Sequence, residues 1–174
     1  MDLPARSFNT CDLCDLYQND DSGAFRWLPP IFQSFGGLEI FSGAVSTVKC
    51  YEDNTSVKAA VESAGHGRIL VVDGAGSLRR ALVGGNLAAA AVRNKWAGLL
   101  VHGCVRDIAE LRACNLGISA LALVPMPTQR VQPGLRDVPV QIAGIWVNPG
   151  DWLYADADGI VLSAHPLQGE RPAD

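Results

Sequence analysis

Apolar residues along this chain form two kinds of pattern. Short continuous apolar runs, which predict strands buried on both faces of a sheet, occur at Ile69–Val72, Gly98–Val101 and Leu121–Val124. Alternating apolar and polar positions, which predict strands with one face toward solvent, occur at Leu38–Val48 and Trp152–Ser163. Fully apolar middle strands between alternating outer ones predict an α/β domain with mixed sheets rather than a purely doubly wound fold.

Helical signals lie between these strands. The predicted helices are Thr10–Tyr17 with Thr10 or Asn9 as its cap, a helix from the cap Asn54 through Ala64, the alanine-rich segment Asn86–Lys95, and Asp107–Ala113. The middle of the chain therefore reads strand, helix, strand, which favours a parallel βαβ unit.

Turn residues mark the remaining connections. Gly43 predicts a break or bulge in the first long strand. The run 125–137 reads as loop, and 138–147 reads as a hairpin-like pair of strands around Gly144. We expect a single domain over residues 1–174, with a loose tail after about residue 166.

Composition narrows the class of protein. The chain has 174 residues, 48% of them hydrophobic, which suits one globular domain with a sizeable core. Its net charge of -4 argues against broad nucleic-acid binding, which needs a basic face. The start 1–6 has no apolar signal core, and no apolar run approaches the ~20 residues of a membrane helix, so we expect a cytoplasmic protein with no membrane partner. In that compartment the five cysteines should be mostly reduced.

Three short motifs contain reactive residues in a context that favours a structural role. Cys11 and Cys14 lie on one predicted helix without a second ligand pair, so we expect buried packing thiols rather than a zinc or redox site. The glycine-rich run 73–77 follows a strand, but Arg79 replaces the third glycine of a dinucleotide fingerprint, which favours a tight turn. The run 156–159 lacks the other ligands of a calcium loop and predicts a β-turn.

One compact constellation does indicate chemistry. Gly84, Gly85, Asn86 and Leu87 open a predicted helix, whose backbone N–H groups bind a carboxylate or phosphate. Twenty-odd residues later, a buried strand delivers Arg106 and Asp107 to its carboxyl end, where α/β folds bind ligands. Arginine clamps planar oxygen pairs, and an aspartate is a natural ligand for a hard cation such as Mg²⁺. The segment therefore predicts a site for a small oxygen-rich anion bound on a metal.

Structural alternatives exist for the same residues. Asp107 and Glu110 could simply be acidic residues near the positive end of a helix dipole. The segment 102–104 either lines a pocket beside Arg106 or places His102 at a strand end, bonded to backbone.

Several motifs together resemble the family named for the regulator of ribonuclease activity A, which also includes the class II 4-hydroxy-4-methyl-2-oxoglutarate aldolases. The resemblance covers nearly the whole chain, and its central part is specific. The matching segments are 12–15, 41–43, 48–54, 71–74, 77–84, 103–107 and 154–159.

The resemblance implies a layered α-β-β-α sandwich of the swivelling β/β/α type, and a homotrimer or hexamer with sites between subunits. The aldolases cleave 4-hydroxy-4-methyl-2-oxoglutarate to two pyruvates, decarboxylate oxaloacetate, and need a divalent metal cation, for which we expect Mg²⁺ or Mn²⁺. Both reactions pass through the same pyruvate enolate.

Residue roles follow from the same resemblance. Asp107 would hold the metal, Arg106 would hydrogen-bond the keto oxygen of a 2-oxo acid substrate, and the segment Gly84 to Leu87 would bind its carboxylate. Many of these aldolases have Asp where this chain has Gly85. A second family pattern has Gly there and an acidic residue three after the aspartate, so Glu110 is expected to substitute, by orienting a metal-bound water as the base.

Two other functions compete with this one. Family members that inhibit ribonuclease E are similar overall, and the acidic net charge permits such a partner, although no residue specifies it. At least some of those members lack the acidic residue after the arginine, so Asp107 favours the enzyme. A quinone methyltransferase, a label sometimes attached to this family, ranks last, because the chain has no recognisable S-adenosylmethionine fingerprint.

Overall fold

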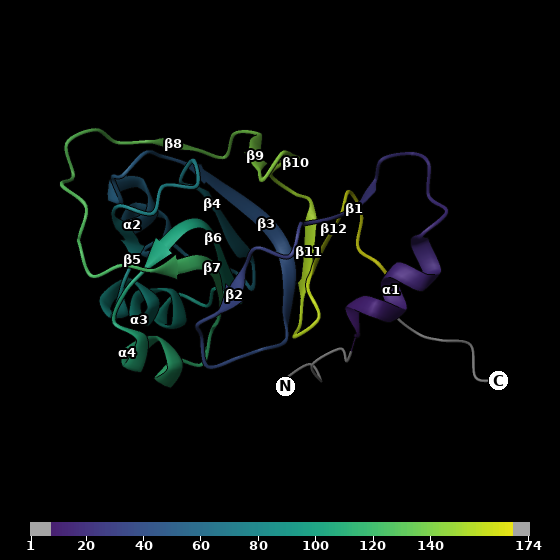
Figure 1. Ribbon diagram of the computed structural model, residues 1–174, viewed down its shortest axis with the longest axis horizontal. Coiled ribbons are helices and arrows are strands. Elements are labelled where there is room, and N and C mark those ends of the chain that lie inside the picture. The colour runs from purple at the N-terminus through teal and green to yellow at the C-terminus, as the bar shows by residue number, and fades with distance from the viewer. Residues whose placement is uncertain (1–7, 169–174) are drawn as a thin grey trace.

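The structure is a computed structural model that describes residues 8–168. It combines short helices with one large sheet (Figure 1). The elements in chain order are α1 (Thr10–Tyr17), β1 (Phe25–Trp27), β2 (Gln33–Ser34), β3 (Phe41–Lys49), α2 (Thr55–Val61), β4 (Ile69–Asp73), β5 (Ala81–Val83), α3 (Gly85–Arg93), β6 (Gly98–Val105), α4 (Ile108–Ala113), β7 (Gly117–Leu123), β8 (Leu135–Arg136), β9 (Val140–Ile142), β10 (Ile145–Val147), β11 (Trp152–Ala155) and β12 (Ile160–Ser163).

One long strand, β3, joins two halves of the sheet. Its first residues pair antiparallel with β11, and Val45–Lys49 pair parallel with β4. The strand order is β1-β12-β11-β3-β4-β6-β7-β2, and β3, β4, β6 and β7 run parallel to one another. The predicted parallel pairing of the two apolar strands, β4 and β6, is therefore confirmed.

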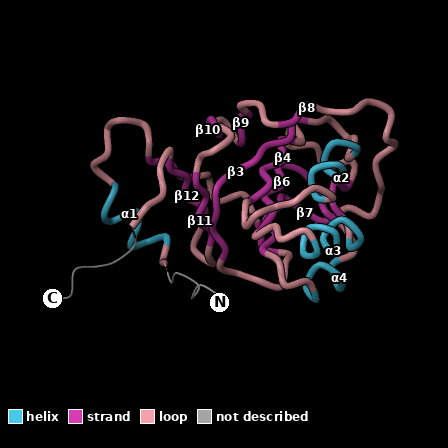
Figure 2. Tube along the Cα trace, turned by 180° about the vertical axis from the view of Figure 1, so that it is seen from behind, coloured by secondary structure: helices cyan, strands magenta, loops and turns pink. Residues whose placement is uncertain are grey.

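Three hydrophobic cores separate four layers. The helices α2, α3 and α4 cover one face of the parallel strands, and their core includes Leu70, Ala91 and Leu99. A second core lies on the other face of these strands, toward β9–β12. The helix α1 packs against β11 and β12 at the opposite end of the molecule through Leu13 (Figures 1 and 2). This arrangement confirms the expected α/β fold with its α-β-β-α layering.

Close packing explains two glycines that blur the strand pattern. Gly43 does not form the predicted bulge, since it pairs in regular register with Leu153, and a Cβ there would lie 2.5 Å from the Gly67 carbonyl oxygen. Gly117 opens β7 against the ring of Phe41, 2.0 Å from where a Cβ would lie. The prediction placed this strand at Leu121, four residues late, because Gly117 and Ser119 interrupt the apolar run that marks a buried strand.

The short strands β1, β2, β5 and β8 were not predicted, because two or three residues are too few to show alternation, and β8 lies in the run 125–137 that was expected to be loop. The hairpin around Gly144 is confirmed as β9 and β10. The run 156–159 is the turn between β11 and β12, as expected.

The predicted packing thiols are only half right. Cys14 lies half-buried against the core under α1, whereas Cys11 is exposed on the outer side of that helix. Most of the tail predicted to be loose, 169–174, lies outside the described residues. Over residues 8–168, every helix is too short or too polar to cross a bilayer.

Candidate active site

The beginning of α3 and the end of β6 meet at one point in the structure. Because β5 and β6 are parallel neighbours in register at Val83 and Val105, the residues that follow each strand lie side by side. The backbone N–H of Gly85 donates a hydrogen bond to Oδ2 of Asp107 at 3.0 Å. The two segments predicted to form the site, 84–87 and 106–107, are thus in direct contact.

Asp107 has an unusual backbone conformation. It occupies the N-cap position of α4 with φ 63 and ψ 48, the left-handed region that non-glycine residues rarely adopt, at a cost of about 1–3 kcal/mol. Its side chain makes no capping hydrogen bond to α4 and turns instead toward α3. Asp107 and Glu110 do lie at the start of α4, as the structural alternative expects, and the carboxylate of Asp107 contacts the start of α3 in addition.

The two glycines that open α3 leave room for the carboxylates. A Cβ on Gly84 would lie 2.6 Å from Oδ2 of Asp107 and 3.2 Å from Cγ of Arg106. A Cβ on Gly85 would lie only 1.6 Å from Oε2 of Glu110. The carboxylate of Glu110 thus occupies the volume that a side chain at position 85 would need.

Arg106 lies beside these carboxylates. Its Nε is 3.8 Å from Oδ2 of Asp107, and its Nη1 donates to the Pro125 carbonyl at 3.4 Å. Both members of this ion pair are about 40% exposed, so the pair adds little to stability. What it does is hold a guanidinium next to a carboxylate at an open edge of the fold.

A cavity of about 690 Å³ opens at this edge. It is lined by residues of α2 and α3 with their caps, of β5, of the segment 106–107 and of the loop after β7. They are Asn54, Lys58, Glu62, Ala81, Gly84, Asn86, Leu87, Ala89, Ala90, Arg93, Arg106, Asp107, Pro127, Thr128, Gln129 and Arg130. Gly85 and Glu110 are not part of this lining; Gly85 is buried and Glu110 is exposed beside it.

The helix start that was predicted to bind an anion lies partly at the cavity. The first N–H groups of a helix have no acceptor within the helix and can bind an anion. The N–H of Gly85 donates to Asp107 in this structure. Gly84, Asn86 and Leu87 line the cavity.

A divalent cation fits Asp107. Among the described residues, no three His, Cys, Asp or Glu side chains are grouped as a complete metal cage. Mg²⁺ does not need one, because it is usually held by one or two carboxylates together with water and substrate oxygens. Asp107 lines the cavity and has only one oxygen engaged by Gly85.

The expectation that the segment 102–104 lines a pocket beside Arg106 is wrong for the cavity described above. His102 and Cys104 do not line the cavity, and Cys104 is fully buried. The backbone carbonyl of His102 accepts hydrogen bonds from the N–H groups of Gly74 and Gly76, and its buried Nδ1, 3.9 Å from Oδ1 of Asp73, has no hydrogen-bond partner among residues 8–168.

Sequence reasoning missed the α2 side of the cavity. Asn54 was predicted as a helix cap, and it does occupy that position, but its side chain makes no capping bond. It bonds instead to Leu82, Thr128 and Arg130, which lie far away in sequence. No local pattern marks these contacts, because they depend on β5 and on the loop after β7.

Comparison with known proteins shows which family this mixed α/β chain belongs to. The model of the RraA-like family, described as Aldolase/RraA, matches residues 10–162. A protein from Albidiferax ferrireducens named "Putative 4-hydroxy-4-methyl-2-oxoglutarate aldolase" is 62% identical over 169 residues, which cover 92% of this chain and 98% of that protein.

Two solved structures share the fold closely. The RNA-processing inhibitor RraA from Thermus thermophilis matches with a TM-score of 0.87 and 45% identity, over 95% of this chain and 98% of that one. A Geobacillus kaustophilus structure described as an S-adenosylmethionine: 2-dimethylmenaquinone methyltransferase matches with a TM-score of 0.85 and 40% identity, over 94% and 99%. The chain belongs to the RraA-like family.

Proposed function

We propose that this protein is a divalent-metal-dependent lyase. It cleaves 4-hydroxy-4-methyl-2-oxoglutarate to two pyruvates and decarboxylates oxaloacetate. One observation carries the proposal: the side chain of Asp107 turns away from its own helix, and Asp107 and Arg106 line a cavity that is also lined by Asn86 and Leu87 at the start of α3. The names of relatives such as the one from Albidiferax ferrireducens support the same activity.

The residues divide the work of holding the substrate. The N–H groups of Asn86 and Leu87 bind the carboxylate next to the keto group, where the helix dipole favours negative charge. Arg106 donates a hydrogen bond to the keto oxygen. Asp107 holds Mg²⁺ or Mn²⁺, which when bound acts as a Lewis acid on the 2-oxo acid.

Bond cleavage then follows from where the charge goes. The 4-hydroxyl loses its proton, the C3–C4 bond breaks, and its electron pair moves into a pyruvate enolate, while the former C4 becomes the ketone of the second pyruvate. Arg106 stabilises the negative oxygen of the enolate more strongly than the neutral keto oxygen, which lowers the barrier. Loss of CO₂ from oxaloacetate yields the same enolate, so the same contacts serve both reactions.

We assign the removal of the 4-hydroxyl proton to a water that acts as the base and is oriented by the carboxylate of Glu110. That carboxylate lies where a side chain at position 85 would be, and many of the aldolases that this chain resembles carry Asp there. Glu110 therefore supplies, from α4, an acidic group in the volume that the Asp fills in those enzymes.

The test is pyruvate release from both substrates with added Mg²⁺ or Mn²⁺, and again with excess chelator. Release above the uncatalysed metal background, lost with chelator, supports the lyase. No release from either substrate would contradict it.

A second candidate is a protein inhibitor of ribonuclease E, favoured by the likeness to the RNA-processing inhibitor RraA. A pull-down with that nuclease, followed by an RNA-cleavage assay, tests it. We also expect a homotrimer or hexamer, which light scattering would check.

A further inference from the structure

The cavity differs in charge from the molecule around it. Its lining contains four cationic side chains and two carboxylates, although the chain as a whole has a net charge of -4. Arg106 and Asp107 form one ion pair. Lys58 forms a second with Glu62 one helical turn away, with Nζ 3.7 Å from Oε1. Arg93 and Arg130 are left, and in the described part of the chain neither has a carboxylate partner.

The loop that carries Arg130 is fixed on both sides. Before it, Oγ1 of Thr128 donates to Oδ1 of Asn54 at 2.8 Å. After it, the backbone N–H of Gln132 donates to Oδ2 of Asp53 at 2.7 Å. Burial acts to raise the pKa of Asp53, but hydrogen bonds from Thr55 and from the loop outweigh it and hold that pKa below its usual range. Asp53 therefore stays ionised and keeps accepting the hydrogen bond from the backbone N–H of Gln132.

Asn54 also fixes the guanidinium itself. Its Nδ2 donates to the Leu82 carbonyl at 3.1 Å, which sets the orientation of the amide and turns Oδ1 toward the loop. Nε of Arg130 donates to that Oδ1 at 3.2 Å. The side chain of Asn54 is buried, so this acceptor does not depend on solvent.

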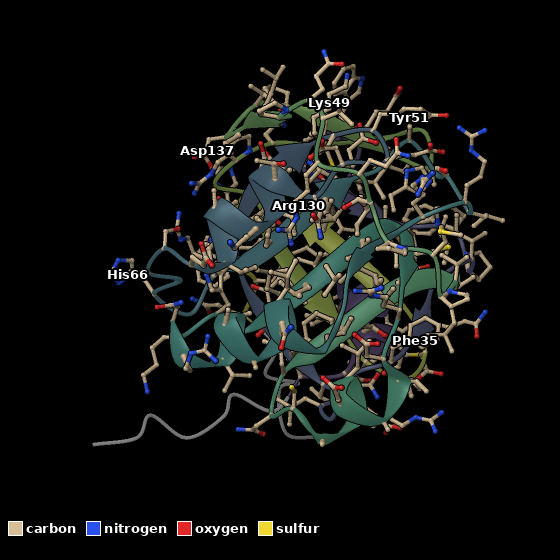
Figure 3. The ribbon with its side chains drawn as sticks, turned by 90° about the vertical axis from the view of Figure 1, so that its left-hand side faces the viewer. Phe35, Lys49, Tyr51, His66, Arg130 and Asp137 are labelled. Carbon is tan, nitrogen blue, oxygen red and sulfur yellow. The ribbon has the colours of Figure 1, made fainter. Side chains whose placement is uncertain are left out.

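Arg130 thus presents its two terminal nitrogens. Its backbone has φ 52, a left-handed conformation held by the contacts on either side. With Nε engaged, Nη1 and Nη2 have no partner among residues 8–168. This pair of donors matches the two oxygens of a carboxylate. Figure 3 looks onto the helical end of the molecule and shows Arg130 near the middle of that face.

We propose that Arg130 binds a second carboxylate of the substrate, on the α2 side of the cavity, and that Asn54 is its positioning residue. Asp107 and Arg106 lie on the α4 side, where the 2-oxo acid group reacts. The proposal rests on the proposed lyase function and narrows its substrates to 2-oxo acids that carry a further carboxylate.

The binding test uses two inert acids of equal length. 2-Oxoglutarate and 2-oxopentanoate differ only in a terminal carboxylate against a methyl group, and calorimetry with Mg²⁺ present compares them. We expect 2-oxoglutarate to bind the wild type roughly 10- to 100-fold more tightly, as for hydrogen bonds to a charged group. Arg130→Ala should abolish that preference without weakening 2-oxopentanoate, and Arg130→Lys should keep part of it.

A matched control comes from the same stretch of chain. Arg136 is exposed and does not line the cavity, so Arg136→Ala should leave the preference unchanged. A loss as large as that of Arg130→Ala would mean a general charge effect and would overturn the proposal.

Steady-state kinetics tests the carboxylate subsite at Arg130 and the positioning role of Asn54. With 4-hydroxy-2-oxoglutarate and 4-hydroxy-2-oxopentanoate, Arg130→Ala and Asn54→Ala should raise KM for the dicarboxylate about tenfold or more, with kcat and the monocarboxylate unaffected. Equal increases in KM for both substrates in Asn54→Ala would overturn its positioning role.

If the wild type binds both inert acids equally well, the subsite is overturned and the lyase stands. If it prefers 2-oxoglutarate but cleaves no substrate, the lyase is overturned and the subsite stands.

Discussion

Two aspartates that each follow a strand have opposite surroundings. Asp156, after β11, accepts hydrogen bonds from the backbone and hydroxyl of Thr10 at 2.7 and 2.6 Å, and from the backbone of Asp158 and Gly159. Asp107, after β6, accepts one backbone hydrogen bond and keeps 39% of its side chain exposed. Both carboxylates end a strand, but only one has its hydrogen-bonding capacity used up by the protein.

The difference separates a structural carboxylate from one available to a ligand. Asp156 ties α1 to the turn between β11 and β12, and its oxygens are fully engaged. Asp107 keeps accepting capacity, at a strained backbone position beside Arg106. The backbone carbonyl of Asp107 accepts the first hydrogen bonds of α4, from Glu110 and Leu111, but its side chain makes no capping bond there. A strained residue whose side chain is left for other contacts is expected at a functional site.

The largest expected effect is a loss of activity when the region around Asp107 is changed. Arg106→Ala should lower kcat/KM for pyruvate release by about 10²-fold or more, because the enolate loses a charged donor. The melting temperature should stay close to that of the wild type, since the ion pair is half exposed. Steady-state kinetics and thermal melts check both. Near-normal turnover in this variant would contradict the mechanism.

The next largest effect is a loss of stability when Asp156 is replaced. Asp156→Ala removes the acceptor of two hydrogen bonds from Thr10 and should destabilise the fold by about 2–3 kcal/mol. Urea denaturation measures the loss, and kcat/KM of the folded protein should not change. A loss of turnover without a loss of stability would reverse the roles assigned to the two aspartates.

A third change tests how Gly85 and Glu110 pack together beside Asp107. Gly85→Ala should destabilise the protein by about 1–3 kcal/mol, because the new Cβ collides with the carboxylate of Glu110. The double variant Gly85→Ala/Glu110→Ala should recover much of that loss, and urea denaturation of the four proteins gives the coupling. Additive losses would show that Glu110 does not occupy this space in solution.

The smallest effect concerns the thiols at the two ends of the molecule. Burial, with Asp73 and Asp53 nearby, raises the pKa of Cys50 to about 12, so it stays protonated at pH 8. Cys11 is exposed on α1. Iodoacetamide at pH 8 should therefore label Cys11 in the native protein and Cys50 only after unfolding, as mass spectrometry would reveal. Native labelling of Cys50 first would contradict the packing described for the helical end.

Much of the fold could be predicted because it rests on local patterns. The apolar run at β4 and the cap of α1, where the Asn9 side chain accepts a hydrogen bond from Asp12, are read from neighbouring residues. Gly43 was misread as a bulge because its cause is the Gly67 carbonyl, more than twenty residues away. Patterns of period two or 3.6 do not record such a contact.

The candidate site likewise has one side that local sequence patterns predicted and one that they did not. Its α4 side, with Arg106 and Asp107, follows from a strand end and a specific motif. Its α2 side does not, since Asn54 looks like an ordinary helix cap until Leu82 and Arg130 are brought to it. A loop residue such as Arg130 shows no periodicity, so only the three-dimensional structure assigns it to the cavity.

The most direct test compares the two aspartates by the same substitution. Mg²⁺-dependent pyruvate release from 4-hydroxy-4-methyl-2-oxoglutarate would be measured for the wild type, Asp107→Asn and Asp156→Asn, at a temperature where all three are folded. The account predicts that Asp107→Asn loses about 10²-fold or more of the activity, while Asp156→Asn keeps that of the wild type. Equal activity in the two variants, or metal-dependent turnover that survives Asp107→Asn, would contradict it.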